Sequence, residues 1–140
     1  MKLTNDQIIY DYIQSLYGLP YRWGGDSTIG GFDCSGLVME LLSVSHGTLP
    51  DMTAQGIHDY FNNHRGIQTV IPMFGTLCFY GRSTKEIIHI GYALNRDIMV
   101  EAGGGGSRTH TEADAEKDNA YIRTRKILER NDFLCSITPK

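Results

Sequence analysis

The stretch that decides the fold is YRWGGDSTIGGFDCSGLVMELL, which runs from Tyr21 to Leu42. It places one cysteine, Cys34, between an aspartate and a serine, where a glycine-rich run gives way to an apolar segment. Glycine favours loops and turns, whereas apolar residues at a spacing of three and four favour a helix. The pattern therefore predicts a loop followed by a helix that starts near Cys34 and ends before Gly47.

The surroundings of Cys34 are typical of a nucleophile. Asp33 is a good N-cap, so Cys34 is predicted to lie in the first turn of the helix. The backbone N–H groups and the positive end of the helix dipole favour the reactive thiolate there, and the same groups can hold an oxyanion. Gly30, Gly31 and Gly36 are small, so a substrate backbone could approach closely. The alternative is a buried cysteine that acts as a small hydrophobic residue.

A nucleophilic cysteine needs a base, which is normally histidine. Among the five histidines, His89 differs because it lies in a predicted strand, IIHIGYAL, residues 87–94. Alternation along this strand predicts that Ile88 faces the core, and it puts His89 on the other face with Gly91 and Ala93. These two small residues would leave open space beside the imidazole. The alternative is a surface histidine on a half-exposed strand.

Glu101 is predicted to lie directly opposite His89. A three-residue hairpin loop over Leu94–Arg96 would pair Ala93 with Asp97, and this register aligns the two side chains. The carboxylate would then orient the ring and stabilise the imidazolium. A loop longer or shorter by one residue would send Glu101 to the other face. The alternative is a surface carboxylate at the end of a strand.

The order of predicted elements indicates the fold class. Apolar residues at helical spacing predict helices over residues 4–16, from 34 to about 45, and from about 53 onward. After Gly66, short segments rich in β-branched and aromatic residues predict strands. This order is typical of an α+β protein, with N-terminal helices packed on a C-terminal antiparallel sheet of about five strands. We expect one domain over residues 1–140.

Charge and composition exclude several classes of partner. The formal net charge is −3 and no run of Lys or Arg exceeds two residues, so we expect no nucleic-acid or membrane partner. The N-terminus has no apolar core of signal-peptide length, so we expect synthesis in the cytoplasm, or export by another route. Cys34, Cys78 and Cys135 are widely spaced without a C-x-x-C motif, which favours reduced thiols and no metal or cofactor.

Several of these segments together resemble the NlpC-type papain-like cysteine peptidases of bacterial cell walls. The resemblance covers about residues 15–102 and rests on PYRWGG, FDCSGLVMELL, DMTAQGI, GTLCFY and IIHIGYAL followed by DIMVEA. It implies a papain-like fold, with Cys34 as the nucleophile, His89 as the base and Glu101 in the orienting position. The family more often has histidine in that third position. It also usually has Asp where this chain has Thr76.

The resemblance also implies residues that bind substrate. Tyr21 matches the tyrosine ahead of the glycine pair, which implies a hydroxyl near the cysteine, in substrate binding or the oxyanion site. Asp33 and Ser35 flank the cysteine and match positions that imply contacts to the free amine of a stem peptide. The expected partner is therefore a peptidoglycan stem peptide or muropeptide.

The implied activity is hydrolysis of peptide bonds in peptidoglycan stem peptides, at the bond between D-γ-glutamate and the diamino acid. An N-acetylmuramoyl-L-alanine amidase or an acyl transferase on the same scaffold is the alternative, because a cysteine–histidine pair serves any acyl transfer. A non-catalytic wall or phage assembly module is a further alternative. The stretches EAGGGGSRT and YIRTRKI resemble single-domain, phage-associated members, which implies action on the cell wall or on muropeptides.

Overall fold

A computed structural model describes residues 3–140 and confirms the predicted α+β class. The chain divides into two compact units. One comprises the residues up to Asp51 together with Ala102–Arg123, and the other comprises Met52–Glu101 together with Thr124–Lys140. Cys34 therefore belongs to the first unit, whereas His89 and Glu101 belong to the second.

The first unit is mainly helical. Its elements are α1 (Asn5–Leu16), β1 (Asp26–Ser27), β2 (Gly31–Phe32), α2 (Cys34–His46) and α4 (Glu112–Asp118). α1 begins with a capping box, in which the Thr4 side chain accepts from the Gln7 backbone N–H and the Gln7 side chain accepts from the Thr4 backbone N–H. α1 and α2 are in contact, and α2 also contacts β1 and β2. The β1–β2 hairpin and α4 were not predicted.

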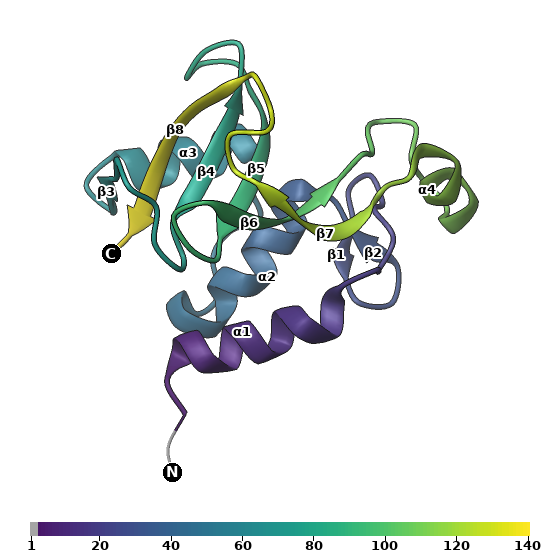
Figure 1. Cartoon of the computed structure of the whole chain (residues 1–140), viewed down its shortest axis with the longest axis horizontal. Coiled ribbons are helices and arrows are strands. Elements are labelled where there is room, and N and C mark those ends of the chain that lie inside the picture. The colour runs from purple at the N-terminus through teal and green to yellow at the C-terminus, as the bar shows by residue number, and fades with distance from the viewer. Residues whose placement is uncertain (1–2) are drawn as a thin grey trace. The chain divides into compact units, whose positions relative to one another are not determined.

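The second unit contains α3 (Ala54–Asn62) and most of a sheet. Its strands are β3 (Gly66–Gln68), β4 (Leu77–Gly81), β5 (Ile87–Ala93) and β8 (Phe133–Pro139), while β6 (Ile98–Gly103) and β7 (Tyr121–Lys126) contribute residues to both units. The strand order is β3-β8-β4-β5-β6-β7, so β8 inserts between β3 and β4 (Figure 1). The sheet thus has six strands where the sequence predicted about five.

Both faces of the central strands are buried. On one face α3 packs against β3, β5 and β8, and the His58 ring meets the edge of Phe79. On the other face a second apolar cluster forms from Cys78, Tyr80, Ala93, Met99 and Ile127. The sheet is therefore not one-sided, and His89 lies among buried side chains rather than beside an open face.

The prediction for Ile88 in β5 is wrong. Ile88 was expected in the core but is 67% exposed. The register shifts between Tyr80 and Gly81, so that Tyr80 pairs with His89 and Gly81 with Ile87. Ile88 is thus the extra residue of a bulge, which turns its side chain away from the core.

The space beside Gly91 is also not open. A side-chain carbon built on Gly91 would collide with the sulfur of Met99 on the neighbouring strand. Met99 therefore fills the space next to the β5 backbone at Gly91. Among residues 3–140, no helix has the length and apolar character needed to cross a bilayer.

Candidate active site

The start of α2 is built as the sequence predicts, with Asp33 as its N-cap. One carboxylate oxygen of Asp33 accepts from the Gly36 N–H at 2.7 Å, and the other accepts from the Gly24 N–H at 3.0 Å. The Ser35 hydroxyl donates to the first oxygen at 3.2 Å. Cys34 is consequently the first helical residue, at the positive end of the α2 dipole. The structure thus brings together Asp33, Cys34 and Ser35.

Asp33 has a strong structural role beyond any contact to substrate. Its partial burial raises the pKa of the carboxyl group, whereas the hydrogen bonds from Gly36, Gly24 and Ser35 act in the opposite direction. Two of these donors are backbone groups that hold the glycine loop against the first turn of α2. A carboxylate has acceptor capacity for further donors, so the capping role and a contact to an amine are compatible.

The glycines around Cys34 pack against the chain itself, which differs from the expected role in substrate approach. A side-chain carbon at Gly36 would collide with the carbonyl oxygen of Gly25, and one at Gly31 would collide with that of Pro20. Gly31 also has a φ of +101°, a conformation that other residues rarely adopt. These glycines therefore let the loop lie directly against the first turn of α2.

Tyr21 lies in the same unit as Cys34 and is only 4% exposed. Its backbone N–H donates to the Ala120 carbonyl at 2.9 Å, and it forms a bridge with Phe32. Burial raises the pKa of its hydroxyl, and the charges that Cys34 and Asp33 carry when ionised raise it further. The phenol is therefore neutral at ordinary pH and can donate a hydrogen bond.

The ring of Tyr21 packs against the backbone of Gly105. A side-chain carbon at Gly105 would overlap with the ring, at 2.5 Å from Cγ and 2.6 Å from Cε1. The contact between Gly105 and Tyr21 was not predicted from the sequence. The signal available was the run of four glycines, Gly103–Gly106, because such a run often marks a close backbone approach.

The histidine part of the candidate site lies in the second unit. His89 Nε2 and Glu101 Oε1 are 2.7 Å apart, which is the distance of a strong hydrogen bond. His89 is 6% exposed and Glu101 is fully buried. The predicted hydrogen bond between these two side chains is therefore present. A carboxylate only accepts, so the bond places a proton on Nε2 and leaves Nδ1 as the nitrogen that can exchange a proton.

The register behind this contact differs from the prediction. Tyr92 pairs with Val100 and Ala93 with Met99, so residues 94–98 lie between the last paired residues, two more than predicted. The Asn95 side chain closes this loop by accepting from the Asp97 and Ile98 N–H groups at 2.8 and 2.9 Å. A shift of two residues preserves the face to which each side chain points. Glu101 therefore still faces His89, but diagonally rather than directly across.

Tyr80 of β4 lies on the other side of His89. The two residues are paired across the strands, and their ring centroids are 5.6 Å apart. The Tyr80 hydroxyl donates to the Ile127 carbonyl at 2.7 Å, and burial raises its pKa. The His89 ring is thus held between a fixed aromatic ring on β4 and a buried carboxylate on β6.

The other two cysteines have different surroundings. Cys78 is fully buried in β4, and burial raises the pKa of its thiol to about 12. Cys135 in β8 is half-buried, which raises its thiol pKa as well. Both thiols are therefore protonated at neutral pH, and neither is at the start of a helix. Cys78 is thus packed within the sheet.

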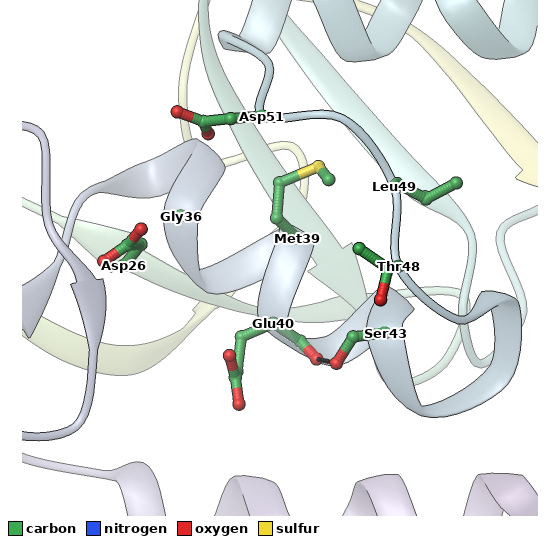
Figure 2. Close-up of a pocket in the computed structure, with 8 residues that line it drawn as sticks. All are labelled: Asp26, Gly36, Met39, Glu40, Ser43, Thr48, Leu49 and Asp51. Carbon is green, nitrogen blue, oxygen red and sulfur yellow. Dashed lines mark hydrogen bonds between the residues drawn. The ribbon is translucent and has the colours of Figure 1, made fainter.

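A cavity of about 250 Å³ opens along α2 in the first unit (Figure 2). It is lined by Asp26, Gly36, Met39, Glu40, Ser43, Thr48, Leu49 and Asp51. The lining residues of α2 follow a spacing of three and four, and this stripe does not include Cys34. The cavity is therefore separate from the predicted nucleophile. Among residues 3–140, no group of three or more metal-ligating side chains is placed to hold a metal ion.

Comparison with known proteins identifies the family. The NlpC/P60 family profile matches residues 18–127. The chain belongs to the NlpC/P60 family. It is 30% identical over 127 residues to the peptidoglycan endopeptidase RipB of Mycobacterium tuberculosis, which covers 82% of this chain and 50% of RipB. It is 27% identical over 122 residues to the gamma-D-glutamyl-L-lysine dipeptidyl-peptidase of Bacillus subtilis, covering 86% of this chain and 36% of that protein.

Solved structures confirm the papain-like NlpC/P60 fold. A lipoprotein-like NLP/P60 family protein of Staphylococcus aureus superposes with a TM-score of 0.72 at 19% identity, covering 99% of this chain and 42% of that one. RipD of Mycobacterium tuberculosis, described as a non-catalytic NlpC/p60 domain protein adapted to peptidoglycan binding, superposes with a TM-score of 0.69 at 15% identity. RipD and this chain each cover 98% of the other. The chain spans half or less of the curated relatives it matches.

Proposed function

We propose that this protein is a cysteine endopeptidase that hydrolyses peptide bonds in peptidoglycan stem peptides, with Cys34, His89 and Glu101 as its catalytic residues. The hydrogen bond of 2.7 Å between His89 and Glu101 carries the proposal. A fully buried carboxylate is costly unless it has a partner, and here the partner is the base that the chemistry requires. Cys34 supports the proposal because it is the one cysteine at a helix start.

In the proposed reaction the Cys34 thiolate attacks the carbonyl carbon of the scissile amide. The His89 imidazolium gives its Nδ1 proton to the leaving nitrogen as the C–N bond breaks, and a thioester remains on Cys34. A water molecule then attacks the thioester and gives one proton to Nδ1; the C–S bond breaks to release the Cys34 thiolate, and the carboxylic acid product leaves and loses its proton to solvent. Glu101 holds the ring and stabilises the imidazolium throughout.

The proposed bond joins D-γ-glutamate to the diamino acid of the stem peptide. The name of the Bacillus subtilis dipeptidyl-peptidase supports this choice, since that relative is named for a γ-D-glutamyl-L-lysine bond. In the proposal, Asp33 and Ser35 contact the free amine of the stem peptide, because a carboxylate and a hydroxyl are suitable acceptors for an ammonium group. The Tyr21 hydroxyl donates to the substrate or to the oxyanion.

Digestion of purified muropeptides, with mass analysis of the products, tests the proposal. We expect the wild-type protein to release a fragment cut between D-γ-glutamate and the diamino acid, and the Cys34→Ala variant to release none. Release of the intact stem peptide from the sugar would instead indicate an amidase. Binding of muropeptide without any product would indicate a non-catalytic role, as described for RipD.

A further inference from the structure

Glu101 has a second charged neighbour that the proposed reaction does not use. Its Oε1 meets His89, while its Oε2 lies 3.7 Å from an NH1 nitrogen of Arg125 on β7. Arg125 is half-buried, with 26% of its side chain exposed, whereas Glu101 is fully buried. The carboxylate thus lies between the histidine ring and a guanidinium group.

Arg125 is itself held in place. Its Nε donates to Glu129 Oε2 at 2.8 Å, so one edge of the guanidinium is fixed and another is directed at Glu101. The strand that carries Arg125 is anchored as well, because the N–H of Ile127 donates to the Asp97 carbonyl at 2.9 Å. His89, Glu101, Arg125 and Glu129 therefore form a continuous chain of alternating charge when His89 is protonated.

The other charged and titratable groups near Glu101 in this unit do not replace Arg125. Arg130 is bound through two hydrogen bonds to Asp132, at 2.9 and 2.8 Å, and its guanidinium lies over the Tyr80 ring at 5.2 Å. The charge of Glu101 contributes to the raised pKa of Arg130, but the Asp132 hydrogen bonds are the larger cause. The raised pKa of Tyr80 keeps its phenol neutral.

We propose that Arg125 is a positioning residue, which holds the Glu101 carboxylate ionised and oriented so that its Oε1 keeps the hydrogen bond to His89 Nε2. A fully buried carboxylate loses the solvation that favours its charged form, and a nearby fixed cation restores part of that stabilisation. Arginine suits this role because it stays charged at all ordinary pH values and presents several donors in a fixed plane. The inference rests on the proposed function, in which Glu101 orients His89.

The first experiment detects the hydrogen bond between His89 and Glu101 by NMR and does not depend on enzyme activity. In the Cys34→Ala protein, the His89 Nε2–H proton should give a downfield NMR resonance, because it is buried and bound to a carboxylate. We expect this resonance to be lost or exchange-broadened in Arg125→Gln and partly restored in Arg125→Lys, which keeps the charge. Arg96→Gln is the matched control, since Arg96 is 74% exposed and forms an ion pair with the equally exposed Asp97.

The second experiment measures kcat and KM for muropeptide cleavage. Arg125→Gln should lower kcat roughly 3- to 30-fold with little change in KM, and Arg125→Lys should recover part of the loss. In a Glu101→Gln background, Arg125→Gln should cause no further loss, because Arg125 acts through the carboxylate. An equal loss in both backgrounds would overturn the inference.

The failures of the two proposals are distinguishable. A wild-type protein that cuts no muropeptide, together with a resonance lost in Arg125→Gln, would refute the proposed function and support the positioning role. An Arg125→Gln enzyme with the wild-type rate and an unchanged resonance would refute the positioning role and leave the proposed function standing.

Discussion

Substitution of Gly105 by alanine should disable Tyr21 without altering any proposed catalytic group. The added carbon would lie within 2.6 Å of the Cγ and Cε1 atoms of the Tyr21 ring, which is far closer than real carbon atoms approach. Gly105 does not have the positive φ that would strain an alanine backbone. The substitution therefore acts by displacing the ring, and with it the hydroxyl proposed to lie beside Cys34.

The size of the effect follows from the packing around Tyr21. The side chain is 4% exposed, so the ring has little room to move, and overpacking of this kind costs about 1–3 kcal/mol. For a domain of this size, that loss corresponds to a fall in Tm of roughly 4 to 12 °C. If the displaced hydroxyl is an oxyanion donor, kcat should fall by up to about 100-fold.

Thermal unfolding and muropeptide cleavage, measured for three variants, test whether Gly105→Ala acts by displacing the Tyr21 ring. Gly106→Ala is the matched control, because a carbon added at Gly106 would meet nothing within 4 Å. Tyr21→Phe keeps the ring and removes the hydroxyl, so it should lose activity while retaining most of its stability. Cleavage rates of Gly105→Ala and Gly106→Ala that agree within about threefold would refute the reasoning.

Two further predictions concern the reactive groups. Iodoacetamide at neutral pH should label Cys34 fastest, and activity should be lost at the same rate. Cys78 should react slowly, because it is buried and its thiol pKa is raised to about 12. Faster labelling of Cys78 with retained activity would contradict the assignment of Cys34 as the nucleophile. Glu101→Gln should lower the rate by roughly 10- to 1000-fold, because no carboxylate then holds the His89 ring. Glu101→His should keep part of the activity, and an unchanged rate in Glu101→Gln would argue against the role of the carboxylate.

Local signals in the sequence were sufficient to predict the helix starts. The Thr4 capping box and the Asp33 N-cap both depend on residues within three positions of each other, so they are readable without tertiary information. The same kind of signal is present at α4, which was not predicted, where Thr111 and Asp114 form a capping box. Short-range hydrogen bonding therefore determines these elements.

Features that depend on contacts between strands were less predictable. The face of Glu101 was predicted, but its register was wrong by two residues because the Asn95 side chain closes a longer loop than expected. The bulge that exposes Ile88 arises from pairing with β4, which no pattern within β5 reveals. The ion pair between Arg125 and Glu101 joins residues from adjacent strands, β7 and β6, and such pairs require the sheet order.

The proposed function requires Cys34 and His89 to act on the same bond, and a bifunctional alkylating reagent can test this requirement. Dibromoacetone alkylates a thiolate first and can then alkylate a nearby imidazole nitrogen across a three-carbon bridge. After proteolysis, mass spectrometry should find the peptide containing Cys34 joined to the peptide containing His89, and the link should disappear in His89→Ala. Cys34 alkylated at one end only, or joined to a different residue, would contradict the account.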